Sequence, residues 1–426
     1  MTPARPKDEL TRIAAELAHL PAAQRAERWL ALDEETAADA FDLLHPWEQR
    51  ELLEELGEDE VARLLEEMEP DDRVELLRHM PAEDADRALS GLSSAERRLT
   101  YALLAHPPRS AGRIMSPEFL ALRPEETVAA ALEQVREHGA GLETLLLLPV
   151  VDREGRLAGA VPLTELVCAD PERPVAEVTD ELYPAVDPDT DQERVARLMH
   201  EHDLVAVPVV DAERRPLGIV TVDDAIEVLE HEHTEDIHRA GGASEPLGIP
   251  YRAASVGRLV RARIGWLLFL VATGAVTVSV LDAFEATLGK VVTLTLFVPV
   301  LIGTGGNCGS QAATTMTRAL AVGDVTLRDV VPAVLKETRV GLLLGLLFAA
   351  LGLPVITALW SLDIAATVSL SLLAICTWAT TVGAALPMLS QRLGVDPAVV
   401  SAPVVSSLVD ATGLVIYLAI ARAIVL

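Results

Sequence analysis

Basic residues are scarce in this sequence, and the shortage is confined to its first part. The chain has 35 Lys or Arg against 64 Asp or Glu, a formal net charge of −29. Residues 258–426 hold ten basic and eight acidic residues, which leaves a net charge of −31 on residues 1–257. Because neutralising phosphates requires a basic surface, this distribution argues against nucleic-acid binding. It fits a cation-binding surface, or one that is simply soluble and acidic.

Cysteine is also scarce, and several familiar motifs are missing. The three cysteines, Cys168, Cys308 and Cys376, form no C-x-x-C pair, so the sequence indicates neither a disulfide framework nor a zinc site, and it suits a reducing compartment. Residues 1–30 are charged and lack the apolar core of a signal peptide, so we expect the soluble part to stay in the cytoplasm. No Ser/His/Asp constellation, phosphate loop or H-E-x-x-H motif suggests an enzyme.

Residues 1–110 have the pattern of short helices joined by tight breaks. In 67–77 and 79–89, Pro is followed by carboxylates, which complement the positive end of a helix dipole. Related phrases at 33–44 and 46–56 predict an all-α, short-period superhelix. The simpler interpretation of the acidic residues is that they form a solvated face.

Residues 111–240 contain two copies of one module. The segments 145–165 and 204–228 each have a β-branched run ending in P-V-V-D, a polar turn, a glycine-containing second strand and a helix start. This pattern resembles a tandem pair of cystathionine-β-synthase-type (CBS) domains. The resemblance implies an α/β domain pair that dimerises and senses adenine nucleotides or ions. The alternative is a scaffold that serves only for dimerisation.

The helix expected at 223–238 is unusually acidic. Four of its carboxylates lie within a few turns: Asp224, Glu227, Glu235 and Asp236. Like charges at this spacing destabilise a helix unless a cation intervenes, and a divalent cation would do so. Three histidines in the same segment suggest a transition-metal site instead: His231, His233 and His238. Their spacing is not the i, i+4 pair with a third ligand that zinc prefers.

The part of the sequence after Gly242 has the pattern of a membrane domain. An amphipathic stretch at 256–263 is expected to connect the modules to the membrane. Five apolar stretches follow, each long enough to cross a hydrocarbon core of about 30 Å, at 264–281, 288–317, 330–360, 364–390 and 398–425. The clusters of basic residues that flank these stretches fall on one side if Arg258, Arg261 and Arg263 are cytoplasmic, which places the C-terminus outside.

Two of these stretches carry polar groups that a lipid-facing helix would not need. Residues 298–320 contain several glycines together with Asn307, Gln311 and threonines, and we interpret this stretch as pore lining. Asp410 is the acid deep within a span, and no Lys or Arg lies at comparable depth, so a cation is its natural counter-charge. The alternative is a glycine-rich packing motif beside a buried acid.

The motifs G-G-N-C-G-S-Q in the second span and D-P-A-V-V-S-A-P-V-V-S-S-L-V-D-A-T-G leading into the fifth resemble the MgtE family of magnesium channels or transporters. The resemblance covers the whole chain and implies four parts: an N domain (1–110), the CBS pair (111–240), a connecting or plug helix (241–263) and a five-helix pore domain (264–426). It implies a homodimer in a plasma (inner) membrane, with the ion path along the dimer axis. The pore residues implied are Asp410, Asn307, Gly305, Gly306, Gln311 and Thr314. Cys308 stands where alanine is usual, and Ala402 where a polar residue is expected.

The same resemblance implies a gate that closes when cytoplasmic Mg²⁺ is high and bridges carboxylates of the soluble domains. The CBS-side residues implied are Asp191, Glu193, Asp203, Asp224, Glu227, Glu232, Glu235 and Asp236. The N-domain candidates are Asp39, Asp71 and Glu75. ATP at the CBS domains is a further candidate ligand, and membrane lipid is the expected surrounding.

Two other functions remain open from the sequence. One is a carrier or channel for Mn²⁺, Co²⁺ or Zn²⁺. Soft ligands would favour these ions, but Cys308 is the only such residue near the expected path. The other is a membrane sensor that transports nothing and signals nucleotide or ion levels through its CBS pair.

Overall fold

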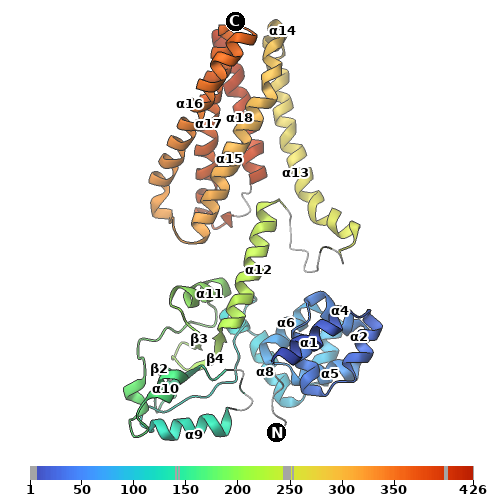
Figure 1. Cartoon of the computed structure of the whole chain (residues 1–426), viewed down its shortest axis with the longest axis vertical. Coiled ribbons are helices and arrows are strands. Elements are labelled where there is room, and N and C mark those ends of the chain that lie inside the picture. The colour runs from blue at the N-terminus through green and yellow to red at the C-terminus, as the bar shows by residue number, and fades with distance from the viewer. Residues whose placement is uncertain are drawn as a thin grey trace. The chain divides into compact units, whose positions relative to one another are not determined.

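The computed structural model describes residues 7–139, 142, 144–242, 251, 254–397 and 402–425 (Figure 1). Part of the predicted connecting segment and residues 398–401 of the motif before the fifth span therefore lie outside the described residues. The chain divides into two compact units, Met1–Glu232 and His233–Leu426, which are described separately.

The first unit begins with a regular array of eight helices. Their bounds are α1 Lys7–Ala18, α2 Ala22–Trp29, α3 Glu34–Asp42, α4 Pro46–Glu55, α5 Glu58–Glu67, α6 Pro70–His79, α7 Ala82–Gly91 and α8 Ser94–Leu104. Helices α3, α5 and α7 begin at residues 34, 58 and 82, and α2, α4, α6 and α8 at 22, 46, 70 and 94, so the repeat is 24 residues long. The predicted all-α superhelix is confirmed, and proline starts α4 and α6.

Two buried arginines repeat with the helices. Arg25 and Arg73 are almost fully buried, at 2% and 1% exposed. Arg25 donates hydrogen bonds to the carbonyl oxygens of Leu17, Leu20 and Glu48, and Arg73 to those of Leu65, Met68 and Glu96. Each member of the second set lies 48 residues, or two repeats, after its counterpart. Each guanidinium thus supplies donors that buried carbonyls at helix ends require.

The CBS pair consists of two copies of one small sheet with its helices. Its elements are η1 Ala111–Arg113, α9 Val128–His138, β1 Leu147–Val151, β2 Leu157–Pro162, α10 Leu163–Cys168, η2 Val175–Val178, α11 Gln192–Glu201, β3 Ala206–Val210, β4 Pro216–Thr221 and α12 Val222–Ala240. β1 pairs antiparallel with β2, and β3 with β4. Both ladders shift register at the last valine of P-V-V-D, at Val150/Val151 and Val209/Val210. The predicted repeat is confirmed down to this irregularity.

The N domain and the second CBS copy share one hydrophobic core. Val74 of α6 and Leu103 of α8 pack in the same cluster as Val195, Ala225 and Val228 of α11 and α12. This shared core holds α6 against the acidic helix α12. The sequence patterns alone did not indicate this contact.

The second unit contains the five predicted spans. Its elements are α13 Val256–Ala283, α14 Glu285–Lys290, η3 Val292–Phe297, α15 Val298–Ala321, η4 Leu327–Asp329, α16 Val330–Leu359, α17 Leu362–Arg392 and α18 Ala402–Ile424. Helices α13, α15, α16, α17 and α18 are long and apolar enough to cross a membrane. α13 begins at Val256 and continues unbroken, so residues 256–263 of the predicted connecting helix are continuous with the first span.

Helix α17 is at the centre of this unit. It packs against α15, α16 and α18 (Figure 1). The approach to α16 is close because Gly345 has no side chain: a Cβ there would lie 2.6 Å from Cα of Leu373. α13 contacts α18 but buries none of its own residues within the chain.

Candidate ion site and its acidic surroundings

Glycines on α15 bring the pore candidate Asp410 close to the predicted second-span motif. A Cβ at Gly306 would lie 2.6 Å from Oγ of Ser406 and 3.2 Å from Oδ1 of Asp410. Gly305 is equally enclosed, since a Cβ there would lie 2.5 Å from Cγ2 of Ile375 and 3.2 Å from Cγ1 of Val409. These glycines are therefore buried contact points between helices, and through them α15 reaches the one acid deep in α18.

A different face of α15 carries the remaining pore candidates. Asn307, Gln311 and Thr314 are exposed, at i, i+4 and i+7 of the helix, so they share one face. Within the part of the chain that the structure describes, none of these three side chains makes a hydrogen bond. An amide left without partners in hydrocarbon costs several kcal/mol. This face therefore needs water or a second protein surface.

The contact at Ala402 accounts for one departure noted in the sequence. The hydroxyl of Ser310 on α15 donates a hydrogen bond to the carbonyl oxygen of Ala402, at 3.1 Å. Because the acceptor is the backbone, no polar side chain is needed at residue 402 for this link between α15 and α18. Higher on α18, Nε1 of Trp378 donates to Oγ1 of Thr412 at 2.9 Å, which links α17 to the same helix.

Acidic side chains gather where the N domain meets α12. Asp42 is exposed, yet protein surrounds its carboxyl closely enough that desolvation, followed by the charges of Asp72, Asp39 and Glu227, raises its pKa to about 8. Desolvation is also the main cause that raises the pKa of Glu227, to which Glu75 contributes. Asp42 and Asp72 were not among the residues predicted from the sequence. The available signal was the i, i+3 spacing of Asp39 and Asp42 on one helix.

Several of the predicted regulatory acids already have partners. Asp191 accepts hydrogen bonds from the backbone at the start of α11, and Asp224 accepts from Thr221. The ion pairs formed by the predicted acids are Glu193 with Arg197, Glu232 with Arg109, and Glu235 with Arg239. Arg239 also pairs with Asp396, which precedes α18. Asp203 is exposed with a left-handed backbone, at φ 53°.

The remaining candidates are spread over the N domain. Asp39 on α3 is exposed, whereas Asp71 and Glu75 lie on α6, buried and half-buried respectively. Among the described residues, no three His, Cys, Asp or Glu side chains are grouped closely enough to hold a metal ion. The predicted regulatory acids that the structure describes thus lie on several elements and do not form a finished coordination shell.

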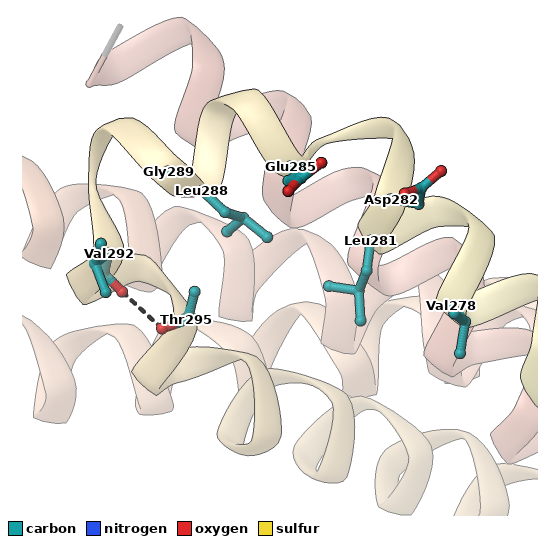
Figure 2. Close-up of a pocket in the computed structure, with 8 residues that line it drawn as sticks. All are labelled: Val278, Leu281, Asp282, Glu285, Leu288, Gly289, Val292 and Thr295. Atoms are coloured by element: carbon teal, nitrogen blue, oxygen red, sulfur yellow. Dashed lines mark hydrogen bonds between the residues drawn. The ribbon is translucent and has the colours of Figure 1, made fainter.

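A cavity of about 490 Å³ lies elsewhere, at the end of α13 farther from its arginines. Figure 2 shows Asp282 and Glu285 beside apolar side chains such as Leu281 and Leu288. None of the predicted pore or regulatory residues lines this cavity.

Family comparisons follow the same division of the chain. Residues 9–109 match the MgtE intracellular N domain, residues 111–172 and 175–231 match the CBS domain, and residues 298–420 match MgtE, described as a divalent cation transporter. The magnesium transporter MgtE of Thermus thermophilus is 46% identical over 329 residues, which are 75% of this chain and 71% of that protein.

The chain belongs to the MgtE family. The MgtE of Enterococcus faecalis is 32% identical over 75% of this chain and 70% of its own length. A crystal structure described as the cytosolic domain of the Mg²⁺ channel MgtE in complex with ATP is 38% identical, covering 52% of this chain and 87% of that chain, with a TM-score of 0.36. The family match in 298–420 spans both halves of the candidate ion site, α15 and most of α18.

Proposed function

We propose that this MgtE-family protein carries Mg²⁺ across the membrane into the cytoplasm, as a homodimer whose ion path runs between the two copies of α15 and α18. The observation that carries the proposal is the contact of Gly306 with Asp410 beside the exposed face of Asn307, Gln311 and Thr314. A second subunit across that face would enclose a water-filled path, which would satisfy the amides.

Magnesium suits this arrangement of ligands. Mg²⁺ gives up its waters reluctantly, and proteins usually hold it through one or two carboxylates while several waters remain bound. Two copies of Asp410, one from each subunit, would supply that charge. Asn307, Gln311 and nearby carbonyl oxygens would hydrogen-bond the water shell, so that the ion is selected by cavity size and charge.

The test is Mg²⁺ flux into vesicles that contain the purified protein with Asp410→Asn. We expect the Mg²⁺ flux to fall to a small fraction of the wild-type flux, because the pore loses its negative charges. Asp363→Asn is the matched control, since Asp363 is an exposed acid in the first turn of α17. Undiminished flux through Asp410→Asn would refute the assignment of the pore.

We further propose that cytoplasmic Mg²⁺ closes the path by bridging carboxylates of the soluble domains. The support is the repulsive group of Asp39, Asp42, Asp72 and Glu227, where α3 and α6 meet α12. A divalent cation there would remove the repulsion and hold the N domain against α12. When Mg²⁺ falls, the acids repel one another and the closed arrangement loses stability.

Neutralising this group tests the gate separately from the pore. The double variant Asp42→Asn/Glu227→Gln should conduct Mg²⁺ but need more Mg²⁺ on the cytoplasmic side for inhibition. Inhibition at the wild-type concentration would refute the role of this group and leave the pore assignment intact. Glu54→Gln, on the exposed surface of α4, is a control.

The two rival functions are separated by the same vesicles. If Mn²⁺, Co²⁺ or Zn²⁺ enters faster than Mg²⁺ in competition, the transported ion is a different divalent cation. If no divalent cation enters vesicles holding only this protein, the chain is a sensor. The proposal requires Mg²⁺ entry that other divalent ions do not outcompete.

Orientation and the second ligand of the CBS pair also remain proposals. Arginines at the start of α13 support a cytoplasmic position for that end and hence an external C-terminus. The test is a cysteine placed in a C-terminal tag, which a membrane-impermeant thiol reagent should label from outside the cell if the C-terminus is external. The match to the CBS domain supports ATP as a ligand, and calorimetric titration of the purified protein with ATP would detect it.

A further inference from the structure

Two cysteines that play no part in the proposed ion path face each other inside the membrane unit. Sγ of Cys308 on α15 lies 3.8 Å from Sγ of Cys376 on α17. Both residues are buried, at 6% and 0% exposed, and both are free thiols. They share a small apolar cluster with Ala379, Val405 and Val409. The two helices that bear them come from different predicted spans, 68 residues apart in the chain.

The backbones around this pair are already close. One residue after Cys308, the carbonyl oxygen of Gly309 would lie 2.3 Å from a Cβ at Gly383 on α17. A disulfide requires the sulfurs to approach to about 2.05 Å. The sulfurs must therefore approach by less than about 2 Å from their observed separation of 3.8 Å.

We propose that Cys308 and Cys376 form an oxidisable thiol pair whose disulfide fixes α15 to α17 and slows Mg²⁺ transport. Cys308 lies next to Asn307 and two residues from Gly306, which faces Asp410. A covalent link at Cys308 therefore restrains the segment of α15 that carries the candidate ion site. Burial excludes charged oxidants, so the reactive class is small, neutral two-electron oxidants that partition into the membrane.

The chemistry balances with diamide, a neutral diazene, as the oxidant. The sulfur of one cysteine adds to the N=N bond and forms an S–N bond. The sulfur of the other cysteine then attacks the first sulfur, so that the S–S bond forms and the S–N bond breaks. The diazene is reduced to a hydrazine, which takes up both thiol protons and the two electrons. Tributylphosphine, which is neutral, reverses the reaction: its phosphorus attacks one sulfur and breaks the S–S bond, and water then supplies the oxygen of the phosphine oxide and the two thiol protons.

The experiment uses the full chain in vesicles, treated with diamide and then divided for peptide mapping and Mg²⁺ flux. We expect a Cys308–Cys376 cross-linked peptide that has lost two hydrogen atoms. We also expect a several-fold loss of flux, which the phosphine restores. Cys308→Ala should keep its flux and lose sensitivity to the oxidant. Cys168→Ser removes the exposed cysteine of the CBS pair and should remain sensitive.

Two results would overturn the proposal. No cross-linked peptide in wild type after oxidation would show that the pair is not oxidisable, whatever happens to flux. A cross-link that leaves flux unchanged, or an equal loss of flux in Cys308→Ala, would show that the link does not restrain transport. The flux readout rests on the proposed Mg²⁺ transport, but the peptide readout does not, so the two failures can be told apart.

Discussion

Gly306 of α15 lies directly against Asp410 of α18, and a methyl group fits there only if the side chains of Ser406 and Asp410 move. A Cβ at residue 306 would be 3.2 Å from Oδ1 of Asp410 and 2.6 Å from Oγ of Ser406. The position of the carboxylate that we assign to the pore thus depends on a missing side chain one helix away. The requirement for glycine is steric, because residue 306 lies within a helix, where no left-handed backbone is needed.

Substitution at this contact should therefore affect transport more than folding. In Gly306→Ala, the new methyl group displaces Ser406 and Asp410, and we expect Mg²⁺ flux in vesicles to fall about tenfold or more, as for other small misplacements of functional groups. Gly274→Ala on α13 is the control, because a Cβ there meets nothing within 4 Å and residue 274 is exposed on a helix that carries none of the proposed pore residues. Equal flux in the two variants would show that the contact is not required.

Close packing of α16 on α17 predicts a loss of stability. In Gly345→Ala, the methyl group would lie 2.6 Å from Cα and 3.0 Å from the carbonyl oxygen of Leu373, both backbone atoms that cannot rotate away. We expect destabilisation of about 1–3 kcal/mol from overpacking, seen as a lower melting temperature in detergent. In Gly352→Ala on the same helix, the nearest atom is 3.7 Å away, an ordinary contact. A melting temperature that falls as far for residue 352 would contradict this explanation.

Arg73, one of the two buried arginines of the N domain, predicts a larger loss of stability than Gly345 does. Arg73→Met leaves the carbonyls of Leu65 and Met68 without their donor and removes the partner of Glu96. A buried acceptor left without a donor costs roughly 1–3 kcal/mol, and the two carbonyls account for most of the expected loss because Glu96 is partly exposed. The urea midpoint, followed through the fluorescence of Trp29 and Trp47, should fall accordingly. Arg63→Met, at an exposed ion pair with Glu60, should shift it little.

The raised pKa of Asp42 predicts that the first unit loses stability as pH rises. Its pKa rises from 3.8 to about 8 in the folded chain, so the folded state holds a proton that the unfolded state has released between these values. The stabilisation is therefore complete below pH 3.8 and is lost as pH rises towards about 8. With divalent ions removed, amide hydrogen exchange in α3 and α6 should accelerate across this range beyond the intrinsic pH effect. In Asp42→Asn, the exchange rates in α3 and α6 should depend less on pH. An equally steep dependence in this variant would refute the role of Asp42.

The ion pairs of Arg239 predict a change in Mg²⁺ sensitivity. This guanidinium pairs with both Glu235 and Asp396, so its positive charge lies where a divalent metal ion could otherwise link the two carboxylates. In Arg239→Gln, both acids lose this positive charge and attract divalent ions more strongly, so inhibition by cytoplasmic Mg²⁺ should occur at a several-fold lower concentration. Flux measured against internal Mg²⁺ provides the test. Arg258→Gln, at the exposed start of α13, is the control, and a shift to higher Mg²⁺ in Arg239→Gln would contradict the prediction.

The sequence predicted the features that depend on local periodicity. The short-period helical array, the two P-V-V-D modules and the five spans each leave a regular pattern within a few turns or one hairpin, whereas the 24-residue length of the repeat comes from the structure. The sequence grouped Gly305 and Gly306 with Asn307 and Gln311 as pore residues, and only the structure separates the buried glycines from the exposed amides.

Contacts between distant segments could not be predicted in the same way. Arg239 and Asp396 are 157 residues apart, and Cys308 and Cys376 are 68 apart, so only the packing of whole helices brings them together. The raised pKa of Asp42 likewise depends on α6 and α12, which the hydrophobic core formed by the N domain and the second CBS copy places beside α3. The acidic composition indicated that some carboxylates would lie close together, but it did not identify which residues these are.

The repeat that sets Arg25 and Arg73 at equivalent positions has a consequence for how the N domain can change in length. The three backbone contacts of Arg73 recur two repeats earlier at Arg25, so helices two repeats apart are held to their neighbours in the same way. Insertions or deletions in whole multiples of the repeat would preserve all of these neighbour relationships, whereas a shift of a few residues would break them throughout the array. The distance from the tip of the N domain to α12 is thus adjustable only in fixed steps.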